Sequence, residues 1–335
     1  MARRIDSELL LVGSLPLASR REAATPGGEL YRGLSFASPG GEAGVMVTWA
    51  AYDHASLHQP RHDVAIMGSG AESQRPMGRQ AGPAAWEGTE GPRYERWPPI
   101  DQAIASYGTF CRLRDTGLIP RHLRFQVAVP LRTSCTAAFA DSVERDPETR
   151  DAVYEDLFTR EIRRLTAAIP PGDLALQLDM AWEAPDRESM TGRADNGDRL
   201  ERFVGPLRRL MPLVPQETPL GLHLCYGTLP VGQVHEPRDL RWLVKMANHA
   251  AENAGRVLDY LYLAGPPDPR SADSDFYAPL ADLKCPDTRV FLGIGLPADG
   301  AEGLRRRRGL ASAFIDDFGV AMYCGATRKP KQHGS

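Results

Sequence analysis

The sequence predicts an α/β protein with the fold of a single (β/α)8 TIM barrel. Apolar runs of strand length alternate with helical patterns along the chain, which is typical of a parallel sheet with helices on its outer face. The length of 335 residues suits one such barrel. No G-x-G-x-x-G sequence follows the first predicted strand, which disfavours the competing interpretation of a doubly wound open sheet.

Eight short apolar segments are the predicted strands. Their residues are apolar at successive positions, as expected of parallel strands that are buried on both faces. The segments are residues 8–13, a weaker one within 30–48, and then 123–129, 174–178, 220–224, 258–263, 290–294 and 319–322.

Helical patterns lie between these strands. Apolar residues recur there every three or four positions, and Gly117 and the pair Pro170-Pro171 mark two of the helix ends. The predicted helices are residues 100–115, 150–169, 198–213, 236–253 and 300–314. The four consecutive arginines 305–308 are predicted to form a solvated face of the last helix.

One segment interrupts this alternation. Residues 59–99 are rich in Gly, Pro, Ser, Gln and Arg and are too long for an ordinary connection, so they predict an insertion or lid after the second strand. We expect residues 1–335 to form a single domain and residues 328–335 to be a frayed tail.

Composition narrows the classes of function. The net charge of −3 offers no basic surface for nucleic acid, and no apolar run approaches the roughly 20 residues of a membrane helix. Asp6 and Glu8 interrupt the apolar start of the chain, unlike a signal peptide. The odd number of five cysteines indicates reduced thiols. We expect a cytoplasmic protein that acts on a small molecule without binding nucleic acid or membrane, and homo-oligomerisation stays open.

Metal-capable residues lie at the ends of two predicted strands. Chemistry in a barrel collects at the carboxyl ends of its strands. His223 and Cys225, two residues apart, point to the same side of one strand, and Cys324 follows the last strand. One imidazole and two thiolates suit zinc and leave a fourth position open. The alternative for His223 and Cys225 is a buried structural role.

Polar residues at other strand ends are candidates for binding and catalysis. Asp179 follows a buried apolar run, where a carboxylate is costly unless it binds a substrate or forms an ion pair with an arginine. Glu42 lies in a glycine-flanked turn and is either a catalytic group or a solvent-exposed acid. Further candidates for substrate binding are Ser14, which could instead cap a helix, together with Gln126, Glu183 and Tyr226.

These residues together resemble one family. Ser14 in VGSLP, Asp179 in LQLDMAWE, His223 and Cys225 in GLHLCYG and Cys324 in YCGATRKP are similar to the cobalamin-independent methionine synthase family, in its catalytic C-terminal barrel and stand-alone single-barrel relatives. The resemblance extends over residues 10–330. It implies a (β/α)8 barrel whose zinc ion holds a substrate thiol as the thiolate that attacks a methyl donor.

The resemblance also implies roles for individual residues. His223, Cys225 and Cys324 would be zinc ligands, and Asp179 would bind the amino group of the substrate. Ser14 and Glu42 would line the substrate pocket.

Three positions depart from the family. Ala264 stands where the family has a glutamate as fourth zinc ligand, Leu296 replaces a histidine thought to donate a proton, and Gly40 replaces an aspartate. We therefore expect a zinc-dependent methyl or alkyl transferase acting on a thiol or a small acidic metabolite, rather than methionine synthesis itself. A metal-assisted lyase and a degenerate, non-catalytic ligand-binding barrel are the alternatives.

Overall fold

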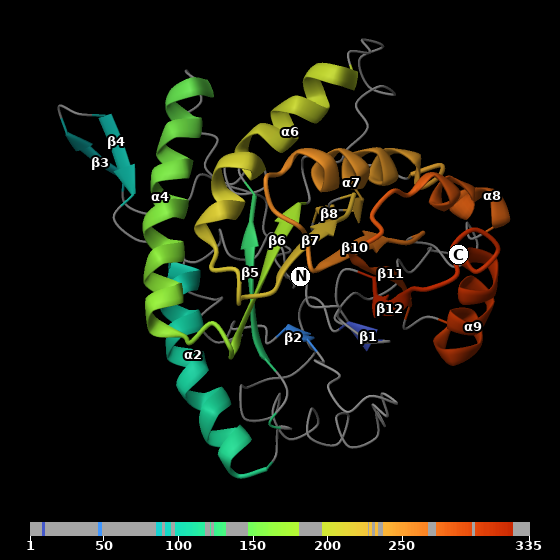
Figure 1. Cartoon of the computed structure of the whole chain (residues 1–335), viewed down its shortest axis with the longest axis horizontal. Helices are drawn as coiled ribbons and strands as arrows, with labels where there is room; N and C mark the ends of the chain where they lie inside the picture. Colours follow the sequence, from blue (N-terminus) through green and yellow to red (C-terminus); the bar gives the residue numbers. More distant parts are fainter. Residues whose placement is uncertain are drawn as a thin grey trace.

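The strands form one parallel sheet. The computed structural model describes residues 9–10, 46–48, 85–88, 91–94, 98–117, 121, 124–131, 147–180, 196–226, 228–229, 232–233, 237–266, 273–296 and 299–323. Within these residues the sheet has the order β1-β12-β11-β10-β7-β6-β5-β2 (Figure 1). Its strands are β1 (Leu9–Leu10), β2 (Met46–Thr48), β5 (Arg124–Pro130), β6 (Leu174–Met180), β7 (Leu220–Leu224), β10 (Tyr260–Ala264), β11 (Arg289–Gly295) and β12 (Gly319–Met322). Each of the eight predicted segments contains or overlaps one of them.

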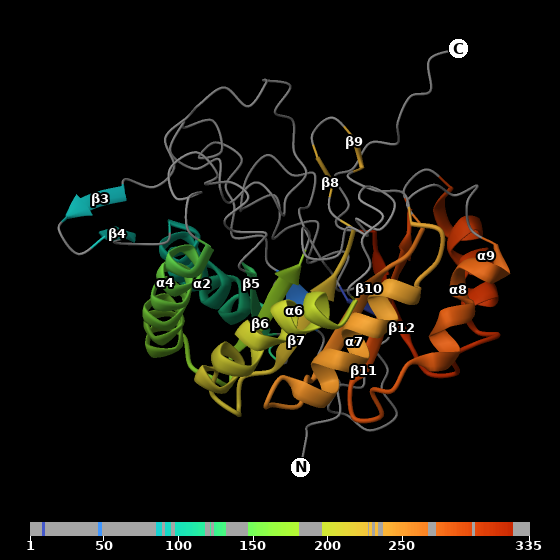
Figure 2. The same ribbon diagram turned by 90° about the horizontal axis from the view of Figure 1, so that it is seen from above.

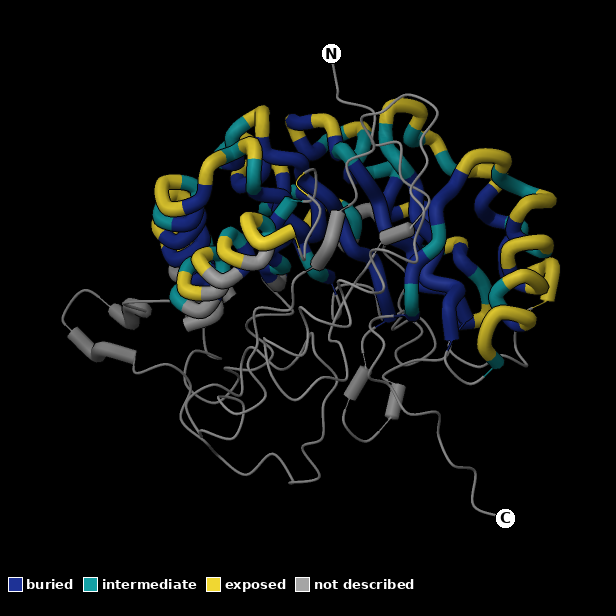
Figure 3. Tube along the Cα trace, turned by 90° about the horizontal axis from the view of Figure 1, so that it is seen from below, coloured by how far each residue is buried: buried dark blue, intermediate teal, exposed yellow. Residues whose placement is uncertain are grey.

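The sheet curls into a half-barrel, and helices cover its outer face (Figures 1 and 2). The helices are α2 (Pro98–Asp115), α4 (Pro147–Ala168), α6 (Asn196–Leu210), α7 (Arg241–Asn253), α8 (Ser274–Tyr277) and α9 (Gly300–Ala311), with 3-10 turns η4 (Met211–Leu213) and η6 (Ala278–Asp282). Figure 3 shows buried strands inside and exposed residues on the outer sides of the helices. The α/β class and the parallel sheet are confirmed.

Apolar burial between helices and sheet holds this arrangement. Phe158, Ile162 and Leu165 lie on the buried side of α4, at the i, i+4, i+7 spacing of one helical face. The central strand β7 is buried along its whole length. Burial of this kind supplies roughly 25 cal/mol per Å² of apolar surface, which makes the strand-helix core the main source of stability.

The two ends of the strand order approach each other. Cα atoms of β1 and β2 come within 8 Å of one another, although no ladder joins these two strands among the described residues. A closed eight-stranded barrel would require that ladder. The structure therefore establishes the curled parallel sheet.

Two hairpins add to the alternating pattern. β3 (Ala85–Gly88) and β4 (Gly91–Tyr94) pair antiparallel within the segment 59–99, for which the sequence predicts only an irregular insertion. The rest of that segment up to Trp97, and the predicted tail 328–335, lie outside the described residues. β8 (Thr228–Leu229) and β9 (Gly232–Gln233) form a second hairpin, which lies beyond the carboxyl end of the sheet (Figure 2).

Helix α7 begins later than predicted. Residues 237–240 are not helical, and the helix starts at Arg241 instead of 236. The Asp239 carboxylate accepts the Arg241 N–H at 2.8 Å, an Asx-type turn that competes with helical hydrogen bonds.

The prediction of a fully solvated arginine run in α9 is wrong at Arg307. Arg305, Arg306 and Arg308 are exposed, whereas Arg307 has 0% exposure. Its Nε donates to the Ile294 carbonyl at 2.7 Å, and its two terminal nitrogens donate to the Asp299 carboxylate at 2.5 and 2.7 Å. This paired, hydrogen-bonded setting makes a buried guanidinium tolerable.

No helix in the described part of the chain is long and apolar enough to cross a membrane.

Candidate functional site

Polar residues of neighbouring strands meet near the carboxyl end of the sheet. Asp179 of β6 pairs in register with His223 of β7, which pairs with Tyr262 of β10. Residues paired in a parallel sheet point to the same face, so the three side chains form one row. Apolar residues such as Leu222 and Leu261 alternate with this row and suit the helix-covered face. The polar row therefore faces the inside of the half-barrel.

A chain of hydrogen bonds leads from Asp179 into the interior. Gln177 Nε2 donates to Asp179 Oδ1 at 2.7 Å, and Gln177 Oε1 accepts from Gln126 Nε2 at 2.7 Å and from the Tyr260 hydroxyl at 3.3 Å. Gln126, Gln177 and Tyr260 are all buried. Burial raises the pKa of Tyr260 well above its usual value, with the nearby negative charge of Asp179 as the next cause. The hydroxyl thus keeps its proton and remains a donor.

A glycine makes room for the Tyr260 ring. Gly221 lies beside Tyr260 in the ladder between β7 and β10, and a Cβ built on Gly221 would stand 1.9 Å from Tyr260 Cζ. The phenol therefore lies over the bare backbone of β7 and reaches β6 on the far side. Only glycine permits so close an approach.

His223 is held by an aromatic neighbour. Its ring stacks on Tyr262 with centroids 4.0 Å apart and an angle of 5° between the planes. The Tyr262 hydroxyl donates to the Met322 carbonyl of β12 at 3.2 Å, passing close to Gly293 of β11. Two strands thus fix the tyrosine against which the 6% exposed imidazole lies.

Cys225 follows β7 directly and is 5% exposed. Its Sγ–H donates to the Met180 carbonyl at 3.2 Å, and its backbone N–H donates to the same oxygen at 3.1 Å. The thiol thus turns toward β6, whereas the His223 ring stacks on β10. Among the described residues, no three His, Cys, Asp or Glu side chains are grouped as a metal site. The described part holds two of the three predicted ligands, because Cys324 lies outside it.

The remaining predicted site residues divide into two groups. Gln126 and Tyr226 are buried; the first donates to Gln177, and the Tyr226 hydroxyl donates to the Asp239 carbonyl at 3.1 Å. Burial raises the pKa of Tyr226 well above its usual value. Direct substrate contact by either stays a prediction. Outside the described residues lie Ser14, Glu42, Glu183 and Cys324.

Apolar residues occupy two of the three positions at which the sequence departs from the family that it resembles, and the third, Gly40, lies outside the described residues. Ala264 ends β10 and is completely buried, and Leu296 directly follows β11 with 8% exposure. Both lie at the carboxyl end of the sheet. Neither can ligate a metal or donate a proton, so any such role falls to other residues.

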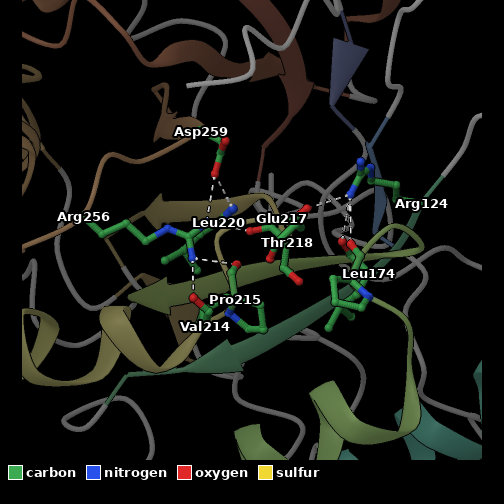
Figure 4. Close-up of polar contacts among 10 residues, drawn as sticks. Arg124, Leu174, Val214, Pro215, Glu217, Thr218, Leu220, Arg256 and Asp259 are labelled. Carbon is green, nitrogen blue, oxygen red and sulfur yellow. Dashed lines mark hydrogen bonds and ion pairs between the residues drawn. The ribbon is translucent and has the colours of Figure 1, made fainter. Parts of the chain in front are cut away.

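The opposite edge of the sheet carries a network of a different kind (Figure 4). Arg256 donates to the carbonyls of Val214, Pro215 and Thr218 at 2.7, 3.0 and 2.6 Å, and Asp259 accepts the Leu220 N–H at 2.8 Å. Both arginine and aspartate come just before strands rather than after them. These bonds satisfy buried backbone groups in the turns that precede β7 and β10, so we assign this network to the fold and not to the site.

The sequence interpretation missed Gln177, Tyr260, Tyr262 and Gly221. A usable signal was present in the alternation Tyr-Leu-Tyr at 260–262, which places two polar rings on one face of an otherwise apolar strand. Gln126 and Gln177 likewise interrupt apolar strands. No such signal relates Gly221 to Tyr260, since the two residues meet only through strand pairing.

Comparisons with known proteins add little to this geometry. No protein-family model matches the chain, and no curated protein is significantly similar to it. Among solved structures, a similar one is the crystal structure of D-psicose 3-epimerase in the presence of D-fructose. It is 11% identical, with a TM-score of 0.40, over 67% of this chain and 71% of that chain.

Proposed function

We propose that this chain is an enzyme, a zinc-dependent methyl or alkyl transferase that activates a thiol or a small acidic metabolite as nucleophile. The observation that carries the proposal is the common location of Asp179, His223 and Cys225 at the carboxyl ends of two neighbouring strands. An acidic group for the substrate and two zinc-type donors therefore lie at the edge where barrel enzymes hold their active sites.

The proposal includes closure of the barrel. The nearness of β1 and β2 supports a closed sheet of eight parallel strands. Cys324, two residues after β12 ends at Met322, would then come to the same rim as Cys225. His223, Cys225 and Cys324 would hold the ion, with the fourth position left for the substrate.

Zinc bound there would lower the pKa of a substrate thiol so that the thiolate is present at neutral pH. The chain's own residues prepare this step. The Tyr262 stack fixes the plane of the His223 imidazole, and the hydrogen bond from Gln177 fixes Asp179. Cys225 must give up the proton that it now donates to Met180 before it can ligate.

The transfer is a simple displacement. The thiolate sulfur forms a bond to the methyl or alkyl carbon of the donor, and the donor's leaving group departs with the electron pair of the broken bond. The thiol proton goes to solvent before the attack. No acid is needed at position 296 if the leaving group is already stable without a proton.

Metal analysis tests the proposal. Purified protein is expected to contain about one zinc per chain, and the variants His223→Ala, Cys225→Ser and Cys324→Ser are each expected to lose most of it. Cys285→Ser is the matched control, because Cys285 lies on the helical side, where its Sγ approaches the Ala247 carbonyl at 3.8 Å. Substoichiometric zinc that is insensitive to all three ligand variants would remove the mechanism.

A reaction screen then identifies the chemistry. Thiols are incubated with methyl-sulfonium or methyl-folate donors, and S-methyl products are measured by mass spectrometry. A transferase gives product only when donor and acceptor are both present. Conversion of one substrate alone would instead establish a metal-assisted lyase, and absence of any turnover with retained ligand binding would establish a non-catalytic barrel.

A further inference from the structure

We infer that Gln177, supported by Gln126 and Tyr260, is a positioning residue that holds the Asp179 carboxylate in one orientation for a cationic group of the ligand. The inference rests on the proposed function only in taking Asp179 as a ligand-binding carboxylate. It assigns to three interior residues a role that acts through the Asp179 carboxylate.

The direction of the hydrogen bonds is set by Asp179. An ionised carboxylate can only accept, so Gln177 must turn its NH2 group toward Asp179 and its carbonyl oxygen inward. Gln126 must then donate its own NH2 to Gln177 Oε1, and the Tyr260 hydroxyl donates to the same oxygen. Each donor in the chain therefore points toward the carboxylate. This polarity favours a negative charge at Asp179.

At its inner end, this chain of hydrogen bonds has an acceptor without a donor. Gln126 Oε1 is buried and accepts no hydrogen bond from the described residues. Barrel interiors are ordinarily filled with branched apolar side chains, and a leucine at 126 would leave no such orphan. If the hydrogen bonds served stability alone, replacing Gln126 by leucine would raise the stability of the fold. The retained polarity points instead to the carboxylate at the other end.

The geometry also restricts movement. Tyr260 has 0% exposure, and its ring lies against the backbone of Gly221, so its hydroxyl cannot swing away from Gln177. Strands β5, β6 and β10 thus all contribute to the position of a single carboxylate near the rim. A carboxylate fixed in this way binds an ammonium group without first losing rotational freedom.

A pair of small thiols tests the inference. Cysteamine and 2-mercaptoethanol differ by an ammonium and a hydroxyl group, and their affinities are measured by calorimetry on the full-length protein as purified. The wild type is expected to prefer cysteamine by about tenfold or more, as for a hydrogen bond to a charged group. Asp179→Asn is expected to reduce this preference strongly, because it removes the carboxylate that would bind the ammonium group.

The preference for cysteamine is then measured in the positioning variants and compared with that of the wild type and of Asp179→Asn. Gln177→Leu is expected to reduce the preference about threefold or more. Tyr260→Phe removes a single hydroxyl and should reduce it about twofold, which keeps the inference testable if Gln177→Leu does not fold. The matched controls are Gln216→Leu at an exposed turn and Tyr277→Phe, whose buried hydroxyl has no hydrogen-bond partner among the described residues. Both should retain the full preference.

The outcomes separate this inference from the zinc proposal. A preference that Asp179→Asn abolishes, but that Gln177→Leu and Tyr260→Phe leave intact, overturns the positioning role. A wild-type preference that does not depend on Asp179 overturns it as well. Loss of preference in the positioning variants of a protein that contains no zinc supports the positioning role, while the zinc proposal fails.

Discussion

The close approach of Tyr260 to Gly221 makes Gly221→Ala the sharpest test of the interior packing. The new Cβ would lie 1.9, 2.1 and 2.2 Å from Tyr260 Cζ, Cε1 and Cε2. Carbon atoms normally approach to about 3.5 Å, so the ring must shift by roughly 1.5 Å within a fully buried site. Overpacking costs about 1–3 kcal/mol, and loss of the Tyr260 hydrogen bond adds about 1 kcal/mol. We expect a total of about 2–4 kcal/mol.

Equilibrium unfolding in urea, followed by circular dichroism, measures this cost. Gly309→Ala is the matched control, because a Cβ there meets nothing within 4 Å. It should leave stability unchanged or raise it by up to about 1 kcal/mol, since Gly309 lies inside α9.

A double-mutant cycle identifies the cause. In a Tyr260→Ala background the Cβ at 221 enters vacated space, so Gly221→Ala should cost less than about 1 kcal/mol there. Equal costs in both backgrounds, or a cost below 1 kcal/mol in the wild type, would refute the packing argument.

Three further outcomes are expected. Arg307→Met should lower the free energy of unfolding in urea by about 2–4 kcal/mol at pH 7, because Arg307 pairs with the partly exposed Asp299 carboxylate and depresses its pKa. This stabilisation is complete above the pKa of the unfolded carboxyl, near 3.9. The difference in stability from the wild type should therefore narrow as the pH falls below about 4. Arg256→Met should cost about 2–4 kcal/mol by leaving the buried carbonyls of Val214 and Thr218 without their donor, whereas Arg208→Met on the surface should cost less than about 1 kcal/mol. Burial raises the pKa of Cys285 to about 11, so about one thiol in a thousand is ionised at pH 8, and peptide mapping should find Cys285 unmodified by iodoacetamide until urea is added.

Local patterns in the sequence were sufficient for the eight strands of the sheet and for helices α2, α4, α6, α7 and α9, but not for the two hairpins or for α8. Runs at 220–224 and 319–322 match β7 and β12 residue for residue, because a buried parallel strand must be apolar on both faces. Helix ends were less certain at Asp239, where a side chain competed with the backbone. The prediction that all four arginines of 305–308 are solvated was wrong at Arg307, because the sequence of charges does not show that Arg307 pairs with the Asp299 carboxylate.

The candidate site was predictable only in its outline. Asp179, His223 and Cys225 could be placed at strand ends because polar residues interrupt apolar runs there. Their support could not be predicted, because Gln126, Gln177 and Tyr260 come from three separate strands and only tertiary contact joins them.

The sequence by itself thus determined the strands of the parallel sheet, its longer helices and the end of the sheet at which polar groups gather, since these follow from the spacing of apolar residues along one segment. Tertiary structure alone decided which side chains touch: that Tyr260 crosses Gly221 to reach Gln177, and that His223 stacks on Tyr262. The physical reason is that strand order and register bring together residues more than 80 positions apart, as for Gln177 and Tyr260, and no local pattern encodes that pairing.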